Sequence, residues 1–330
     1  MKTVIITDRN THKLFAQKLI HQFKLNHALI LTFKAGELSK NIKTYQRLIS
    51  AMLKNKCGRD TVIYALGGGV VGDMAGFIAA TYMRGIPYIQ IPTTLLAMVD
   101  SSIGGKTAIN TPEGKNLIGA FHQPIQTIIN INYLSTLPQK QLINGLVEAL
   151  KIFMTSNINY FNYANKNINK LLSRDNSVLS KVIQDSITLK LDIVKKDPKE
   201  NNLRAILNFG HTIAHAIEKV SDYKILHGYA VGMGILVEAK ISQLLGCLSS
   251  HDYEIIKNLL SKLNISAELL NKLDIHKIIL ATKSDKKNKA NQTRYVLLKK
   301  IGRVHIANNS YTHAIPDKLV KKAFMLASEV

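Results

Sequence analysis

The chain has 330 residues, a length that predicts two domains with separate hydrophobic cores. Hydrophobic residues make up 46% of it, and no run reaches the ~20 consecutive apolar residues of a membrane span, so we expect no membrane partner. Two cysteines, Cys57 and Cys247, are too few for a disulfide scaffold and indicate a reducing, cytoplasmic environment. The N-terminus lacks the cleavage site of a signal peptide and is typical of a first strand.

The net charge of +22 raises the question of nucleic-acid binding. Residues 1–140 carry 16 basic and 6 acidic side chains (+10), and residues 141–330 carry 28 and 16 (+12), so the excess is spread evenly. Only 8 of the basic residues are arginine, and lysine is poor at bidentate recognition of phosphates and bases. We therefore expect no nucleic-acid partner and an anionic small substrate.

In chain order, the first 140 residues alternate short β-branched runs with helical apolar spacing. Strands are predicted at 3–7, 27–33, 61–67, 88–92 and 127–131, with helices at 14–23, 41–53 and 74–83 between them. Alternation of this kind predicts a mostly parallel sheet covered by helices. We therefore predict an N-terminal α/β domain over residues 1–140.

After residue 140 the helical pattern dominates. Helices are predicted at 141–154, 177–196, 206–220 and 227–245, and the stretch 157–170 also keeps a helical spacing. The segment 293–306 predicts one late hairpin. We therefore predict an all-α C-terminal domain over residues 141–330.

The segment Gly67–Gly72 follows a predicted strand, opens a helix and satisfies G-x-G-x-x-G. Glycines let the backbone approach a pyrophosphate, and the free N–H groups of the helix start attract its charge. The alternative is a strand-to-helix turn without a ligand. No acidic residue follows about 20 positions later, so ribose contacts are expected from Asp8, Asn10 or Glu37 after the earlier strands.

A second glycine-containing stretch, Asp100–Thr107, ends in Gly-Gly-Lys-Thr. It places the Lys106 ammonium beside flexible backbone amides, which suits a phosphate or a carboxylate. Lys115 and Asn116 add a cation and an amide in a glycine-bounded turn. The alternative for each is a solvated surface side chain.

Three histidines and a glutamate suggest a metal site. His211 and His215 are four residues apart on one predicted helical face, and His227 begins the next helix. Glu148 lies within a helix that also carries Lys151. A carboxylate with two or three imidazoles makes a catalytic zinc-type site, and the spacing pairs His211 with His215. The alternative is a set of polar residues satisfied on helix surfaces.

Arg204 and Asn208 precede these histidines at spacings of 4 and 3. A single helix would then present a guanidinium, an amide and two imidazoles on one face, and Lys190 adds a further cation. Such a face is costly to bury unless it binds something charged. This pattern predicts an active site in the C-terminal half.

Taken together, these motifs resemble the 3-dehydroquinate synthase family of sugar-phosphate cyclases. The matching segments are 67–85, 92–124, 134–138 (LSTLP), 145–151 (GLVEALK), 203–218 (LRAILNFGHTIAHAIE) and 227–234 (HGYAVGMG). They occur in the family's order across essentially the whole chain. The resemblance implies a dehydroquinate synthase-like fold, with an N-terminal Rossmann-like NAD-binding domain and a helical domain that binds metal and substrate.

The resemblance also implies residue roles. Zinc or cobalt would be held by Glu148, His211 and His227, and His215 would serve proton transfer or hydrogen bonding beside the substrate. NAD contacts are implied for Asp8, Asn10, Glu37, Lys40, Gly69, Val70, Val71, Gly72, Asp73, Thr93, Thr94, Asp100, Lys106, Lys115, Leu134, Ser135 and Thr136. Substrate contacts are implied for Lys106, Asn116, Lys151, Lys190, Arg204, Asn208 and Lys286 or Lys287.

Arg84 matches an arginine that reaches the neighbouring subunit's site, so the resemblance implies a homodimer. Two positions depart from the family pattern. Tyr229 stands where a glutamate usually follows His-Gly, which is expected to alter the surroundings of His227. Ala35 stands where an aspartate is usual, which is expected to weaken adenosine binding.

The implied activity is a carbon–oxygen lyase reaction of chorismate and aromatic amino acid biosynthesis. It converts 3-deoxy-D-arabino-heptulosonate 7-phosphate to 3-dehydroquinate and phosphate, by NAD-dependent oxidation, β-elimination, re-reduction and intramolecular aldol closure. The alternatives are another sugar-phosphate cyclase, a metal-dependent polyol dehydrogenase that releases NADH, and a basic nucleic-acid-binding module. The retained Lys190, Arg204 and Asn208 favour the substrate that carries a carboxylate as well as a phosphate.

Overall fold

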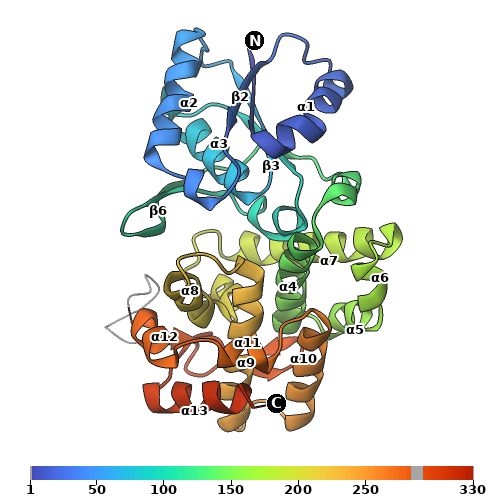
Figure 1. The fold of residues 1–330 in the computed structure, drawn as a ribbon, viewed down its shortest axis with the longest axis vertical. Coiled ribbons are helices and arrows are strands. Elements are labelled where there is room, and N and C mark those ends of the chain that lie inside the picture. Colours follow the sequence, from blue (N-terminus) through green and yellow to red (C-terminus); the bar gives the residue numbers. More distant parts are fainter. Residues whose placement is uncertain (1, 284–292, 330) are drawn as a thin grey trace. The chain divides into compact units, whose positions relative to one another are not determined.

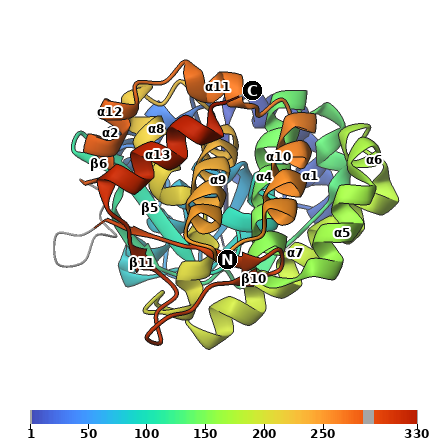
Figure 2. The ribbon, with the colours of Figure 1, turned by 90° about the horizontal axis from the view of Figure 1, so that it is seen from below.

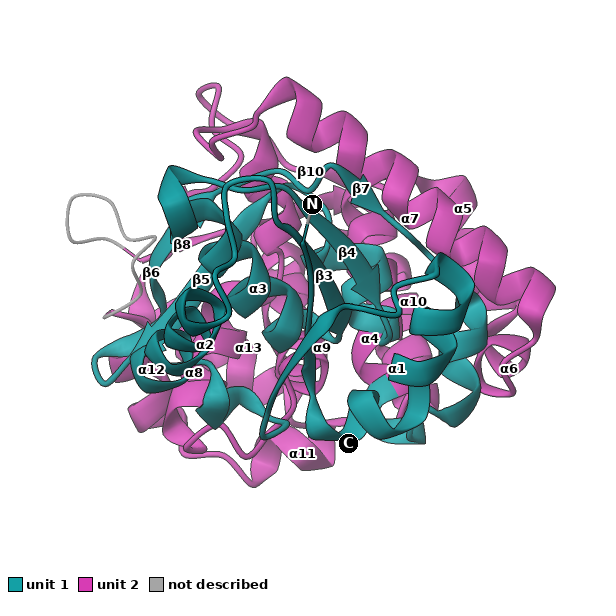
Figure 3. Ribbon diagram, turned by 90° about the horizontal axis from the view of Figure 1, so that it is seen from above, with its two compact units in different colours: residues 1–141 teal, residues 142–330 magenta. Residues whose placement is uncertain are grey.

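The computed structural model describes residues 2–283 and 293–329. By its internal contacts the chain divides into two compact units, Met1–Gln141 and Leu142–Val330, which Figure 3 colours separately. Each unit has its own buried core, and each is described by itself below. Among the described helices, none combines the length and the apolar composition that a membrane crossing requires.

The first unit is built on a five-stranded parallel sheet. Its strands are β1 (Thr3–Asp8), β2 (Leu29–Phe33), β3 (Val62–Gly67), β4 (Tyr88–Pro92) and β7 (Gln126–Thr127), in the order β2-β1-β3-β4-β7. The first four predicted strands are confirmed, whereas the fifth, predicted at 127–131, is the two-residue strand β7 and shares only Thr127 with the prediction. The chain moves outward from β1 to β2 and then crosses back to β3, so the strand order reverses between β1 and β3. Ligands of parallel α/β sheets bind at the carboxyl ends of the strands beside such a reversal.

Helices cover both faces of this sheet (Figure 1). Helix α1 (Arg9–Phe23) lies on one face, and α2 (Ile42–Lys54) and α3 (Gly69–Thr81) lie on the other. Side chains alternate across a strand, so Val4 and Ile6 pack with the α2 and α3 core while the buried Ile5 faces the opposite side. The near-continuous burial of the strands is what a sheet covered on both faces requires.

The glycine-containing stretch Asp100–Thr107 contains no strand up to Gly105, and its last two residues begin an antiparallel hairpin that was not predicted. Strands β5 (Lys106–Thr111) and β6 (Gly114–Phe121) pair with each other, and a register shift lies between Ile109 and Thr111. The hairpin escapes sequence analysis because β6 has no buried face, so its residues show no polar–apolar alternation. Shorter turns connect these elements: 3₁₀ turns at Glu37–Ser39, Tyr82–Arg84 and Ile131–Thr136, and a π-helical turn at Ala97–Ser101.

The second unit is mostly helical (Figure 2). Its helices are α4 (Gln139–Ser156), α5 (Ile158–Lys166), α6 (Ile168–Leu172), α7 (Asn176–Lys196), α8 (His211–Val220), α9 (His227–Leu244), α10 (Ser250–Lys262), α11 (Ala267–Asn271), α12 (Ile275–Thr282) and α13 (Asp317–Ala327). The prediction of an all-α domain needs one amendment. Two short antiparallel pairs are present: the predicted hairpin, formed by β9 (Leu298–Lys300) and β10 (Arg303–Val304), and the pair β8 (Arg294–Tyr295) with β11 (His313–Ala314).

Helices α8 and α9 cross at very close range. A Cβ atom added to Gly234 of α9 would lie 1.9 Å from the carbonyl oxygen of Gly210, which precedes α8. Gly210 itself has a φ of 80°, a left-handed conformation that glycine adopts without a steric penalty. The crossing therefore depends on glycine on both sides, and it brings the N-terminus of α8 against the middle of α9.

The prediction of one continuous helix from Arg204 to His215 is wrong. Residues Leu203–Asn208 form a 3₁₀ turn, and α8 begins only at His211, after the left-handed Gly210. The spacings of 4, 3 and 4 matched a helical face, but they carry no information about the sign of φ at the glycine between them. Arg204 and Asn208 therefore belong to a different element from the two histidines.

Candidate functional site

The centre of the second unit holds a buried carboxylate. Glu148 lies in α4 with no solvent exposure, and the Lys151 ammonium one turn later is 2.9 Å from its Oε2. Apart from this ion pair and two nearby imidazoles, the described residues offer the carboxylate oxygens no hydrogen bond. Burying a carboxylate is costly unless a cation or hydrogen-bond donors compensate it. The site therefore calls for a further cationic partner at Glu148.

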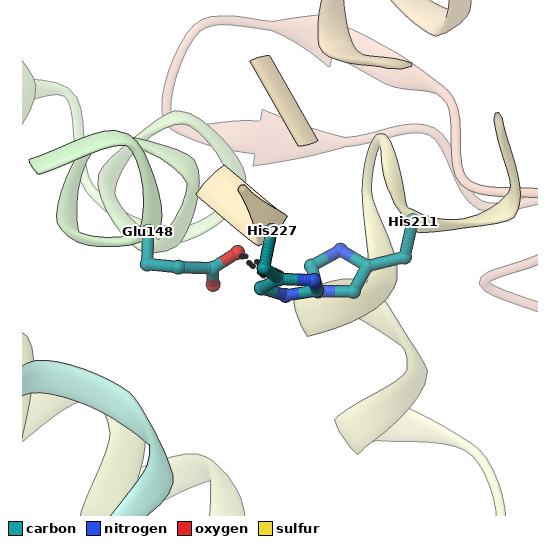
Figure 4. Close-up of side chains that lie close together, drawn as sticks. All are labelled: Glu148, His211 and His227. Atoms are coloured by element: carbon teal, nitrogen blue, oxygen red, sulfur yellow. Dashed lines mark ion pairs between the residues drawn. The ribbon is translucent and has the colours of Figure 1, made fainter. Parts of the chain in front are cut away.

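His211 and His227 face this carboxylate from α8 and α9 (Figure 4). Their Nε2 atoms lie 3.5 Å and 3.6 Å from Glu148 Oε1, and one ligand atom from each of the three residues falls within 4.8 Å of the others. Two ligand atoms at about 2.0–2.1 Å from a tetrahedral zinc lie roughly 3.3–3.5 Å apart. The oxygen and the two nitrogens are thus spaced as ligands that share one ion.

Both imidazoles are oriented through their other nitrogen. His211 Nδ1 lies 3.2 Å from the Phe209 carbonyl oxygen, and His227 Nδ1 lies 3.2 Å from Glu218 Oε2. A proton on each Nδ1 would satisfy these acceptors and leave Nε2 with a lone pair for a metal. Glu218 was not among the predicted residues, although its position seven residues after His211 on α8 places it on the same helical face. Because Glu218 fills this role, Tyr229 does not deprive His227 of a carboxylate neighbour.

Buried side chains also anchor the two helix starts that carry the histidines. The Gly210 N–H donates to Glu238 Oε2 at 2.8 Å, and the Gly228 N–H donates to Asn144 Oδ1 at 2.6 Å. Asn144 lies one helical turn before Glu148 on α4, so that helix supplies both the carboxylate and a hydrogen-bond acceptor for the backbone of Gly228, the residue after His227. Neither anchor was predicted. For Asn144, the signal in the sequence was its four-residue spacing from Glu148.

His215 lies beside the group without belonging to it. Its ring centroid is 5.7 Å from that of His211 and 6.4 Å from that of His227. The spacing-based pairing of His211 with His215 is therefore corrected: the group of possible ligands contains His227 in its place. Residues four apart share a helical face, but the turn of the chain before α9 brings His227 closer to Glu148.

Several predicted substrate residues of the same unit carry a cation or an amide, and the three cations Lys151, Lys190 and Arg204 are buried. Lys151 Nζ also donates to the Leu207 carbonyl at 2.6 Å, and Lys190 is buried on α7. Arg204 is buried, and its Nη1 donates to the Pro198 carbonyl at 2.8 Å. Its backbone N–H donates to Asp197 Oδ2 at 3.0 Å. The Asn208 amide donates to Glu200 Oε1 at 2.6 Å. Lys286 and Lys287 lie outside the described residues.

In the first unit, the glycine-rich turn joins β3 to α3 as predicted. Gly69, Val70, Val71 and Gly72 form the first turn of α3, and no side chain of the described residues caps its N–H groups. A Cβ on Gly69 would lie 2.9 Å from Ser101 Oγ, a buried hydroxyl with no hydrogen-bond partner among the described residues. The N–H groups of Val71 and Gly72 donate to the Gly68 carbonyl, each at 3.0 Å. A helix start without a side-chain cap, with an unsatisfied hydroxyl beside its glycine turn, fits an anionic ligand such as a pyrophosphate.

Two other strand ends lie at the same edge of the sheet. Asp8 ends β1 and caps α1, accepting from the backbone N–H groups of Asn10 and Thr11 at 2.8 Å and 3.0 Å. Thr93 follows β4, and its N–H donates to the Gly67 carbonyl at 2.9 Å. β1, β3 and β4 are adjacent and parallel, so these side chains and the glycine turn share the carboxyl edge beside the reversal of strand order.

Lys40 links three elements of this unit. Its buried ammonium contacts the carboxylate of Asp73 on α3 and the side-chain oxygen of Asn116 on β6. Burial raises the pKa of the Asp73 carboxyl, and the nearby Lys40 ammonium opposes this shift. Glu37 lies one turn earlier, where its carboxylate accepts from the Asn110 amide at 2.8 Å. Lys40, Asp73 and Asn116 were predicted separately, and the structure brings them into contact.

Except for the buried Leu134, the remaining predicted residues of this unit are exposed or half-buried. Lys106 begins β5 and is exposed, and Lys115 is half-buried at the start of β6. Asp100 lies in the π-helical turn, Thr94 follows Thr93, and Arg84 is an exposed residue with a φ of 69°. In the 3₁₀ turn Ile131–Thr136, Leu134 is buried while Ser135 and Thr136 are exposed.

Comparison with known proteins assigns this arrangement to a family. The family models "3-dehydroquinate synthase N-terminal" and "3-dehydroquinate synthase C-terminal" match residues 30–144 and 145–288. The chain belongs to the 3-dehydroquinate synthase family. A curated 3-dehydroquinate synthase from Desulforamulus reducens is 41% identical to it over 308 residues, which cover 92% of this chain and 86% of that protein.

Solved structures extend the likeness from the 3-dehydroquinate synthase family to other cyclases. A 2-deoxy-scyllo-inosose synthase complexed with carbaglucose-6-phosphate, NAD+ and Co2+ is 28% identical, covers 99% of this chain and 90% of its own, and has a TM-score of 0.92. The 2-epi-5-epi-valiolone synthase ValA from Streptomyces hygroscopicus, solved with NAD+ and Zn2+, is 24% identical over 99% of this chain and 91% of its own, with a TM-score of 0.90. The latter likeness shows the fold alone.

Proposed function

We propose that this protein is an NAD- and divalent-metal-dependent 3-dehydroquinate synthase of aromatic biosynthesis. It converts 3-deoxy-D-arabino-heptulosonate 7-phosphate to 3-dehydroquinate and phosphate. The observation that carries the proposal is the shared spacing of Glu148, His211 and His227 around one ion position, in a chain of this family. Similarity to curated 3-dehydroquinate synthases over about nine tenths of the chain favours this product over those of other cyclases.

The second unit would hold the metal and much of the substrate. Glu148, His211 and His227 would bind Zn2+ or Co2+, which acts as a Lewis acid toward a substrate hydroxyl. His215 stands beside these ligands and would move or hold a proton on the substrate. Lys151, Lys190, Arg204, Asn208 and Lys286 would bind the substrate's anionic groups. Both Lys190 and Arg204 are buried cations of this unit.

The first unit would hold the dinucleotide. NAD supplies the hydride chemistry, removing a hydride from the substrate and returning it in each turnover. The uncapped start of α3 would bind its pyrophosphate through Gly69, Val70, Val71, Gly72 and Asp73. Its other contacts would come from Asp8, Asn10, Glu37, Lys40, Thr93, Thr94, Asp100, Lys106, Lys115, Leu134, Ser135 and Thr136, and Asn116 would meet the substrate.

Incubation of the purified protein with the heptulosonate phosphate, NAD+ and Zn2+ or Co2+ tests this function. We expect phosphate release matched by 3-dehydroquinate formation, with no net NADH, because the hydride returns to the substrate in each turnover. Accumulation of NADH would indicate a polyol dehydrogenase, and absence of phosphate release would contradict the cyclase assignment. Omission of the metal after chelation should abolish turnover.

A homodimer and a cytoplasmic location also belong to this proposal. Leu117, Ile118 and Phe121 are exposed apolar residues of β6, and the described residues form no further strand beside β5 and β6 in that sheet. Exposed apolar strands of this kind favour pairing with another chain. The two free cysteines support a reducing compartment.

Light scattering tests the dimer. We expect about twice the 36.7 kDa of one chain, and we expect Phe121→Asp to shift the protein toward the monomer. Arg84→Ala should lower activity while the mass stays that of the dimer, because its side chain would complete the neighbouring site. A wild-type monomer at assay concentrations would contradict the dimer.

A further inference from the structure

Asn110 occupies an irregular position in the β5–β6 hairpin. Ile109 pairs with Ile118 and Thr111 pairs with Gly114, so the register shifts at Asn110. Its backbone N–H donates outside the hairpin, to the Lys40 carbonyl at 2.8 Å, and Asn41 pairs with it in an isolated parallel bridge. Bulges of this kind re-aim a side chain out of the regular ladder. The hairpin is thereby tied to the segment that carries Glu37 and Lys40.

Both ends of the Asn110 side-chain amide are used. Its Nδ2 donates to Glu37 Oε1 at 2.8 Å, and its Oδ1 accepts from the Asn116 N–H at 3.0 Å. A carboxylate accepts only and a backbone N–H donates only, so just one orientation of the amide satisfies both contacts. Asn116 has a φ of 55°, a left-handed conformation that asparagine tolerates and that this bond helps to hold.

The segment that carries Glu37 and Lys40 meets β6 a second time at Lys40, which also reaches α3. Its ammonium contacts Asp73 of α3 and the side-chain oxygen of Asn116. The position of Asn116 is therefore fixed twice, through its backbone by Asn110 and through its side chain by Lys40. Glu37, in contrast, has Asn110 as its described side-chain hydrogen-bond partner. Asn110 thus joins the carboxylate of Glu37, which is proposed to bind the cofactor, to the backbone of Asn116, which is proposed to bind the substrate.

We propose that Asn110 is a positioning residue, which holds Glu37 for the cofactor and Asn116 for the substrate with a single side chain. The inference rests on the proposed function, which gives Glu37 and Asn116 those roles. Asn110 itself need not touch either ligand. Its two hydrogen bonds set the geometry of residues that do.

The two bonds are separable by mutation. Asn110→Ala removes both. Asn110→Asp keeps an oxygen acceptor for the Asn116 N–H but places a carboxylate against the Glu37 carboxylate, which repels it. Combining Asn110→Asp with Glu37→Gln restores a donor–acceptor pair of reversed polarity. Asn26, an exposed asparagine of the same unit, provides matched controls as Asn26→Ala and Asn26→Asp.

The experiment measures three quantities for each variant: the Kd of NAD+ by calorimetry without substrate, the KM and kcat for the heptulosonate phosphate at saturating NAD+, and the melting temperature. We expect Asn110→Asp to raise the Kd of NAD+ about tenfold, since a hydrogen bond to a charged group is lost, and to leave the substrate KM within about twofold. Asn110→Ala should raise both constants. In the Glu37→Gln background, adding Asn110→Asp should raise the Kd by less than about threefold.

Two results would overturn the inference. The first is that Asn110→Asp changes the Kd of NAD+ and the substrate KM as much as Asn110→Ala does, or that both variants change only the melting temperature, as expected for a merely structural residue. The second is that the Glu37→Gln and Asn110→Asp effects on the Kd multiply independently. Failure of the proposed function is distinguishable, because the wild-type protein would then release no phosphate whatever the Asn110 variants do.

Discussion

Glu148 is a single buried residue whose carboxylate charge favours a bound cation in the second unit. It is fully buried, it has one ion-pair partner in Lys151, and two imidazole nitrogens lie at ligand spacing from it. We expect Glu148→Gln to abolish stoichiometric metal binding and to lower kcat by at least about a hundredfold, because loss of an outer partner alone costs 10- to 100-fold. Metal analysis after gel filtration, paired with the phosphate-release assay, measures both effects. Glu254→Gln, an exposed change on α10, is the control, and a fully active, metal-loaded Glu148→Gln protein would refute the assignment.

Glu218 allows a finer test at the same scale, since it acts through His227. Glu218→Ala should weaken metal affinity about 10- to 100-fold, whereas Glu218→Gln should weaken it less, because an amide oxygen still accepts from Nδ1. Competition with a chromophoric chelator measures the affinities. Equal effects of alanine and glutamine would show that the carboxyl oxygen does not orient the imidazole.

Single residues also mark how far the sequence predicts the site. Glu148, His211 and His227 were assigned from a family resemblance, and helical spacing alone chose His215 over His227. Helical spacing relates residues within one helix only, so it cannot predict that α9 lies beside α4. Glu218 and Asn144 were missed for a related reason: each lies one or two helical turns from a predicted ligand, but their partners are on other helices.

At the scale of elements, the α8–α9 crossing determines where both histidines lie. Gly234→Ala would push a Cβ against the Gly210 backbone oxygen, which cannot rotate away. We expect it to destabilise the protein by about 3 kcal/mol or more and to reduce metal binding, because overpacking at this point separates the two helices. Gly232→Ala on the same helix meets the end of the Ile265 side chain instead and should cost clearly less. Urea denaturation compares the two, and equal losses would count against a backbone constraint.

Elements also explain which parts of the fold the sequence did not reveal. The parallel strands were predicted because a doubly covered sheet produces continuous apolar runs, as in Val62–Gly67. The β5–β6 hairpin was missed because β6 shows apolar residues such as Leu117 and Phe121 to solvent, so no buried face generates a pattern. The break before α8 was missed because the left-handed conformation of Gly210 ends the 3₁₀ turn without changing the number of residues between Arg204, Asn208 and the histidines, so the helical spacing in the sequence stays intact.

At the scale of the whole molecule, the metal ligands and the glycine-rich turn belong to different compact units. A ligand that binds only the folded state stabilises it by about 2.7 kcal/mol at a concentration 100 times its Kd. We therefore expect Zn2+ and NAD+ each to raise the melting temperature of the wild-type protein in a concentration-dependent way. In Glu148→Gln the Zn2+ response should disappear while the NAD+ response persists, because the carboxylate lies in the second unit and the residues proposed to bind the dinucleotide lie in the first. Scanning fluorimetry with each ligand alone measures this, and loss of both responses together would mean that the two sites do not form independently.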